Sequence, residues 1–193
     1  MLLRNIVALS LLTASTAIQA DALDFNLRDN SVQMQYFAPM GRDSLGTSEL
    51  HAGFLYNNNN INNNNKSRIF DLGILVKGAV GESDSGVTAG VGVKGLIAST
   101  NVNSALAIAL GGQVRVAPPT VPRLGIVGQL YFSPSIVTYR DAERYFEMDV
   151  RVEYELISKA AAYLGYRTVK VTLKTKNEIE LDSGVFAGVR MSF

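Results

Sequence analysis

The chain has 193 residues with a formal net charge of +1, no cysteine and a single histidine, His51. The lack of cysteine excludes disulfides, thiol catalysis and thiolate-bound metal, and one imidazole excludes a metal site built on several histidines. We therefore expect no metal and no cofactor, and the balanced charge gives no indication of a nucleic-acid partner. Hydrophobic residues make up 47% of the chain and charged residues 18%, which fits a buried β protein or a barrel that faces lipid.

Residues 1–20 have the three parts of a secretory signal peptide. Arg4 supplies the positive charge, residues 6–17 form a short apolar core, and small residues precede a cleavage site after Ala20 or after Ala22. The apolar run is too short for a transmembrane helix, which needs about 20 apolar residues. The prediction is an exported protein with one mature domain, residues 21–193.

The rest of the chain alternates apolar and polar residues with a period of two, which is typical of strands with two unlike faces. The clearest strand is 146–156, where every apolar or aromatic residue is followed by a charged one until Leu156. In the strand after it the alternation shifts by one residue at Val169, which predicts a bulge. In chain order the predicted strands are residues 23–27, 32–36, 48–56, 70–80, 87–93, 106–116, 126–132, 146–156, 162–173 and 179–193.

The connections between these strands carry turn and loop signals. Residues 29–30 read as a hairpin turn, and residues 39–46 and 134–142 read as longer connections. Residues 57–65 are all Asn except Ile61, and this composition predicts a solvated loop. Counted back from a C-terminus in the periplasm, the Asn tract falls outside the cell and the shortest connection, 158–159, falls inside, as in bacterial barrels.

These features predict an antiparallel up-and-down transmembrane β-barrel. Eight strands follow Pro39, and the N-terminal hairpin makes ten, which we favour over eight strands with a cap. The rival is a soluble, lipocalin-like barrel with its apolar faces inward, because alternation alone does not distinguish the two sides. Small residues on the polar faces and the C-terminal Phe193 favour the membrane barrel. Aromatic residues suited to the membrane interfaces are Tyr36, Tyr56, Phe132, Phe146, Tyr154, Tyr166 and Phe193.

Charged residues on the polar faces are expected to line the lumen. The two signs balance at six each, which favours salt bridges that fill the interior, whereas a ring of one sign would favour ion selectivity. The main lumen candidates are Glu147, Asp149, Arg151, Glu153, Arg167, Arg190, Lys94 and Arg115, and the remaining four are Glu49, Asp71, Glu155 and Lys77. The favoured function is a structural or surface role, and the alternative is a narrow passive pore for ions or small solutes.

His51 is the only imidazole available for catalysis, and Glu49 is the nearest carboxylate on the same strand face. Ser48 lies on the opposite face of the strand, and no nucleophile motif is present. We therefore expect no catalytic residue and no enzyme activity, with a lipid-modifying enzyme as a remote alternative. We expect His51 to lie near the barrel mouth and to be partly solvated.

Four stretches resemble the YfaZ family of small outer-membrane proteins: residues 128–134 (GQLYFSP), 139–142 (YRDA), 161–167 (AAYLGYR) and 188–193 (GVRMSF). The resemblance implies a signal peptide and a β-barrel in the outer membrane of a Gram-negative cell, and it implies no reaction or ligand. Phe193 resembles the C-terminal assembly signal of outer-membrane proteins. The expected partners are therefore outer-membrane lipids and the barrel-assembly machinery, and the oligomeric state is left open.

Overall fold

The computed structural model describes residues 22–43, 46–59, 65–81, 85–101 and 103–193, so the predicted signal peptide lies outside the described residues. Within them, no helix is long and apolar enough to cross a membrane. The elements are β1 (Ala22–Arg28), β2 (Ser31–Asp43), β3 (Gly46–Asn59), β4 (Asn65–Ala79), β5 (Val87–Ser99), β6 (Ser104–Val116), β7 (Leu124–Ser133), the 3-10 turn η2 (Ser135–Val137), β8 (Thr138–Arg140), β9 (Ala142–Ile157), β10 (Ala160–Leu173) and β11 (Glu178–Ser192).

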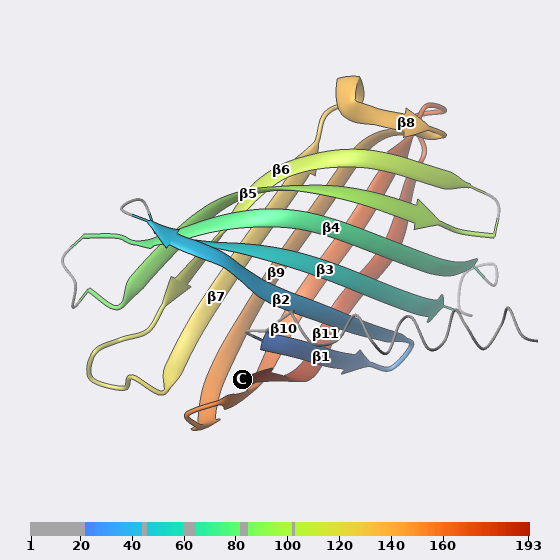
Figure 1. Cartoon of the computed structure of the whole chain (residues 1–193). Helices are drawn as coiled ribbons and strands as arrows, with labels where there is room; N and C mark the ends of the chain where they lie inside the picture. Colours follow the sequence, from blue (N-terminus) through green and yellow to red (C-terminus); the bar gives the residue numbers. More distant parts are fainter. Residues whose placement is uncertain (1–21, 44–45, 60–64, 82–84, 102) are drawn as a thin grey trace, which may run out of the picture.

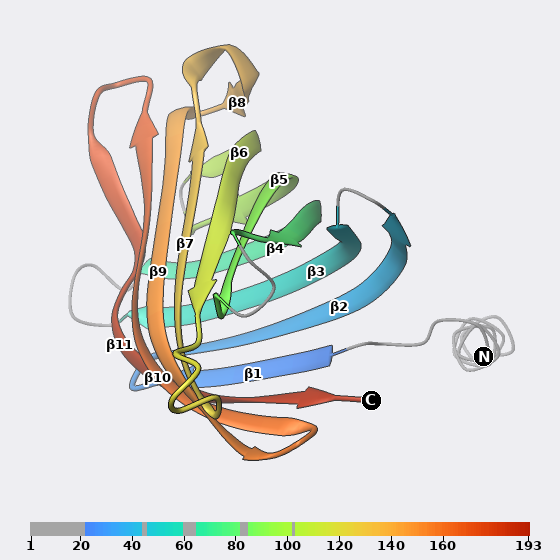
Figure 2. The ribbon, with the colours of Figure 1, turned by 90° about the vertical axis from the view of Figure 1, so that its left-hand side faces the viewer.

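The strands form one antiparallel sheet that closes into a barrel (Figures 1 and 2). Strands that follow one another in the chain pair with each other except at β8, which pairs with β6 while β7 pairs with β9. β11 pairs with β1 to close the sheet. The wall has ten positions around it, because β7 and β8 occupy one position between them. The prediction of ten strands is confirmed, and the alternative of eight strands with an N-terminal cap is wrong, since β1 and β2 belong to the wall.

The shared position of β7 and β8 comes from an interruption in one strand. β7 pairs with Leu110–Val116 of β6, whereas β8 pairs with Ala105–Ala107 of the same strand. The turn η2 lies between them, and a hydrogen bond of 2.9 Å joins the hydroxyls of Ser133 and Thr138 across its base. Residues 134–142 are therefore only partly the loop that the sequence predicted.

The N-terminal hairpin is confirmed, and it leaves a short closing seam. Arg28 pairs with Ser31 around the Asp29–Asn30 turn. β1 has only seven residues, and it pairs with β11 over six of them. β2 is longer than predicted, because it continues through an irregularity at Pro39 to pair with β3 up to Asp43 and Gly46. Both ends of the described chain, Ala22 and Phe193, lie at the same end of the barrel, hereafter the terminal end.

The two faces of the wall are opposite to those of a soluble barrel. Apolar side chains such as Phe70 and Leu110 lie outside and are 52% and 62% exposed. Charged residues such as Asp71 of β4 and Lys94 of β5 lie inside and are buried. The lipocalin-like alternative, which requires apolar residues inside, is therefore wrong for the wall as a whole.

The interior nevertheless contains an apolar cluster at the end opposite to the termini. Its larger members are Leu55, Ile69, Leu96, Tyr131, Tyr145, Val169, Val171 and Leu181, and alanines of β5, β6 and β9 complete it. The predicted bulge at Val169 is misplaced, because β10 stays in register with β9 there and both valines of this strand face inward.

The bulge belongs to the partner strand. Val169 pairs with Asp182 and Lys170 pairs with Glu180, so Leu181 is the extra residue of β11. As a consequence, two consecutive residues face the lumen: Leu181 enters the apolar cluster and Asp182 enters the charged network.

Glycines on the two faces of the wall predict opposite sensitivity to substitution. A Cβ at Gly165 would lie 2.7 Å from Arg151 Cβ and 2.7 Å from Phe186 Cζ inside the lumen, whereas a Cβ at Gly128 would meet nothing within 4 Å. We expect Gly165→Ala to destabilise the barrel by about 1–3 kcal/mol, because the packed interior must shift. Gly128→Ala serves as the control and should change stability by less than about 0.5 kcal/mol. Urea unfolding followed by circular dichroism measures both, and equal midpoints would contradict the packing.

Candidate functional site: the polar lumen

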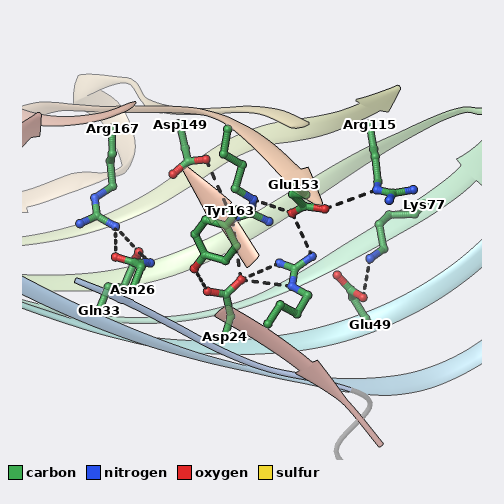
Figure 3. Close-up of polar contacts among 12 residues, drawn as sticks. Asp24, Asn26, Gln33, Glu49, Lys77, Arg115, Asp149, Glu153, Tyr163 and Arg167 are labelled. Carbon is green, nitrogen blue, oxygen red and sulfur yellow. Dashed lines mark hydrogen bonds and ion pairs between the residues drawn. The ribbon is translucent and has the colours of Figure 1, made fainter. Parts of the chain in front are cut away.

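The polar part of the lumen is a network of buried carboxylates and the cations that face them (Figure 3). In the described part of the chain the network contains seven carboxylates, all of them buried. Seven Lys and Arg side chains form ion pairs with these carboxylates. The carboxylates are Asp24, Glu49, Asp71, Glu147, Asp149, Glu153 and Asp182, and the cations are Arg28, Lys77, Lys94, Arg115, Arg151, Arg167 and Arg190. Equal numbers of the two signs satisfy the requirement that buried charge be compensated.

Asp24 of β1 is the centre of the first cluster and has no exposed surface. Its Oδ2 lies 3.0 Å from Arg190 Nη2, 3.1 Å from Arg190 Nε and 3.9 Å from Arg151 Nη1. The hydroxyl of Tyr163 donates a hydrogen bond to the other oxygen of Asp24. Glu153 extends the cluster through Arg151, with 2.8 Å between Nε and Oε1. Four strands, β1, β9, β10 and β11, thus meet at one carboxylate.

A second cluster surrounds Asp182, which faces the lumen beside the extra residue of β11. Arg167 Nη2 and Nε lie 2.6 Å and 2.8 Å from Asp182 Oδ2, and Arg28 Nη1 lies 2.8 Å from Oδ1. The Arg167 guanidinium also donates to Asn26 Oδ1 at 3.2 Å and to the side-chain oxygen of Gln33. The inward polar residues of β1 (Asp24, Asn26 and Arg28) therefore all bond to β10 or β11, so side chains reinforce the short seam.

Asn57, the first residue of the Asn tract, belongs to this second cluster. It is buried, and its Nδ2 donates to Leu181 O at 2.9 Å and to Asp182 Oδ1 at 3.0 Å. The prediction of a solvated loop is therefore wrong for Asn57, because β3 continues to Asn59 and carries this side chain into the lumen. Residues 60–64 of the tract lie outside the described residues.

The third cluster lies where the charged network meets the apolar cluster. Lys94 Nζ is 2.5 Å from Glu147 Oε2 and 4.4 Å from the centroid of the Tyr131 ring. The hydroxyl of Tyr145 donates to the same carboxylate. A buried ammonium is thus held between a carboxylate and an aromatic face, both of which stabilise its charge.

His51 is placed differently from the sequence prediction of a partly solvated residue. It is buried, its Nε2 lies 3.1 Å from Asp71 Oδ1, and its ring packs against Phe37 and Tyr131. Glu49, which the sequence placed nearest to it, bonds instead to Lys77 at 2.6 Å. Among the described residues no group of three or more His, Asp or Glu side chains could hold a metal ion.

The eight main lumen candidates all face the interior, and so do Glu49, Asp71 and Lys77. The sequence prediction omits Asp24, Arg28 and Asp182, although alternation signals each of them. Asp24 and Arg28 alternate with apolar residues on β1, and Asp182 is in phase with the inward Arg190 on β11. Glu155 lies at the rim, where it lines a hollow at the terminal end.

The chain matches the model of the protein family described as "YfaZ precursor" over residues 3–193. The chain belongs to the YfaZ family. The resemblance drawn from its sequence is confirmed, and a precursor implies a cleaved signal peptide. No curated protein matches the chain. The chain is similar to a solved structure titled "Unveiling the Mechanism Behind the in-meso Crystallization of Membrane Proteins", with 12% sequence identity and a TM-score of 0.40. The match covers 90% of this chain and 83% of the chain in that structure. A score that low carries no argument about fold or function.

Three of the four stretches that resemble the YfaZ family carry side chains that fill the lumen or bond across the closing seam. They contribute the aromatic face over Lys94, the hydroxyl bound to Asp24, and both Arg167 and Arg190 of the seam. Residues 139–142 form a corner instead, in which Arg140 has a φ of 67° and Asp141 Oδ2 accepts a hydrogen bond of 2.9 Å from Ser104 N. The resemblance therefore follows residues that close and fill the barrel.

Loss of the Asp24 charge should weaken the closing seam. Asp24→Asn leaves Arg190 with less compensation in a buried site, and we expect a loss of about 3 kcal/mol, typical of a broken buried pair. Glu178→Gln is the control, because it breaks the exposed pair between Lys170 and Glu178 and should leave stability unchanged. The chain lacks Trp, so unfolding is best followed by circular dichroism and by gel migration against temperature. Equal midpoints for the two variants would show that the seam does not depend on this charge.

Proposed function

We propose that the chain is an outer-membrane β-barrel protein with a structural or surface role and a lumen filled by its own side chains. One observation carries the proposal: among the described residues, the apolar cluster fills one end of the interior and paired charges extend from it toward the terminal end. The terminal end would face the periplasm, and the opposite end, at which β3 ends and β4 begins, would face outward.

The outer surface of the wall supports a membrane location. Exposed apolar side chains occur on every long strand, and closed pairing leaves few backbone groups without a partner, as lipid requires. Aromatic side chains lie outward toward both ends, as in the interfacial belts of membrane barrels. Toward the terminal end these are Tyr36, Tyr154 and Phe193, and toward the other end they are Tyr56, Phe132, Phe146 and Tyr166.

The interior supports a closed barrel in preference to a pore. Balanced, paired charges provide no ring of one sign, and the apolar cluster would present a dry barrier to ions. The position of His51 supports the absence of catalysis, because Asp71 and two aromatic rings enclose it. We further propose that the partners are outer-membrane lipids and the assembly machinery, which would recognise β11 and the exposed Phe193.

The membrane location can be tested by fractionation of cells that express the chain. We expect the protein in the outer-membrane fraction, and we expect its gel migration in detergent to differ between unheated and boiled samples, because a closed barrel resists unfolding. A mature N-terminus at Asp21 or Leu23, read by mass spectrometry, would agree with cleavage of the predicted signal peptide. Recovery only in the soluble periplasmic fraction would contradict the proposal.

The closed lumen can be tested by conductance in planar bilayers with concentrated potassium chloride. We expect no current steps for the native protein, because the apolar cluster excludes water. Tyr131→Ala combined with Tyr145→Ala should open a path and produce steps, because both rings are buried in the apolar cluster that fills this end of the lumen. Tyr154→Ala, on the outward face, is the control and should remain silent. Steps from the native protein that depend on Arg151 would favour the pore instead.

A further inference from the structure

The terminal end of the barrel contains two adjacent hollows of about 420 and 230 Å³, both lined by Arg115 and Arg190. We call the two together the terminal vestibule, and its cationic lining consists of Lys77, Arg115, Arg123, Lys159 and Arg190. The apolar cluster lies at the opposite end, so the vestibule is a polar mouth of the barrel. Pockets for small ligands commonly have about this size.

Cations of the vestibule reach solvent, whereas two of its three carboxylates are buried. The side chains of Arg115, Lys77 and Arg190 are 37%, 30% and 21% exposed. Their carboxylate partners Glu49 and Glu153 are only 8% and 6% exposed. Five cations line the vestibule against three carboxylates, Glu49, Glu153 and Glu155. A solute that enters from the terminal end therefore meets mainly positive charge, and low-dielectric walls strengthen that field.

Arg115 has the donor groups that an incoming anion needs. Its Nε lies 3.5 Å from Glu153 Oε2, at the outer limit of a hydrogen bond, and Glu153 is already bonded to Arg151 at 2.8 Å. Figure 3 shows Arg115 and Lys77 at the same end of the network, away from Arg167. The guanidinium packs against Gly125, since a Cβ there would lie 3.0 Å from Arg115 Nη2, and the same side chain lines both hollows. A guanidinium fork that borders a hollow suits the oxygens of a phosphate or a carboxylate.

We infer that the terminal vestibule binds a small solute that carries phosphate or carboxylate groups. Arg115 and Arg123 supply the primary contacts, and Arg190 and Gln113 lie close enough in the lining to add donors. The site goes beyond the proposed structural role, because a barrel closed by its apolar cluster can bind a ligand at this mouth without conducting it. A failure to bind anions would therefore not contradict the closed barrel, and current steps from the native protein would not contradict the binding site.

The test is calorimetric titration of the whole protein in a non-ionic detergent with inorganic phosphate and, separately, with citrate. Sodium chloride at matched ionic strength serves as the blank. We expect saturable binding of at least one of the two anions, and we expect Arg115→Gln and Arg123→Gln each to weaken it by about tenfold or more, as for a lost charge-assisted hydrogen bond. Binding of phosphate alone, of citrate alone or of both supports the site and identifies the preferred group.

The matched control is Arg144→Gln, an exposed arginine on the outer face near the opposite end of the barrel. It should leave the affinity unchanged. Arg115→Gln keeps Glu153 paired with Arg151, so the variant should fold, and unaltered heat-dependent gel migration confirms that it does. No binding beyond that of chloride, or equal affinities for Arg115→Gln and Arg144→Gln in folded protein, would overturn the inference.

Discussion

Closure of the sheet between β1 and β11 is the constraint on which the rest of the structure depends. A barrel removes every strand edge only if its first and last strands pair, and here that pairing extends over six residues. Few backbone hydrogen bonds can form in so short a seam. The side chains of β1 compensate, because Asp24, Asn26 and Arg28 each bond to the last two strands inside the lumen. The charged lumen is therefore part of the closure of the wall.

The same network determines the character of the interior. Charges that close the seam must be compensated in a low-dielectric space, so arginines from β9, β10 and β11 gather around Asp24 and Asp182. Farther from the termini, where β1 has ended, apolar side chains fill the lumen. The result is a barrel with a packed apolar end and a polar end whose exposed groups are mainly cationic. The two ends of the barrel therefore differ in chemical character, and the alternation of residues along the strands does not encode that difference.

Most of the wall was predictable, and much of the lumen was not. All ten wall positions coincide with segments that alternate with a period of two, including 23–27 and 32–36 at the seam. The wrong predictions fall at residues where the polarity of a side chain does not match the face of the wall on which it lies. Val169 and Val171 are apolar yet face inward, and Glu180 faces outward, out of phase with the inward Asp182, because Leu181 is an extra residue in β11. Asn57 was assigned to a loop by composition, yet tertiary contacts extend β3 through it.

The sequence by itself determined where the wall strands lie and that each strand has one apolar and one polar face. Both follow from the alternation of side chains along a strand, which is a local property of consecutive residues. Only the tertiary structure decided which charges pair, where the apolar cluster lies and why the vestibule is cationic. Those outcomes depend on residues far apart in the chain, such as Asp24 and Arg190, which are separated by 166 positions. The closing pair of strands brings them together, and no local pattern specifies their contact.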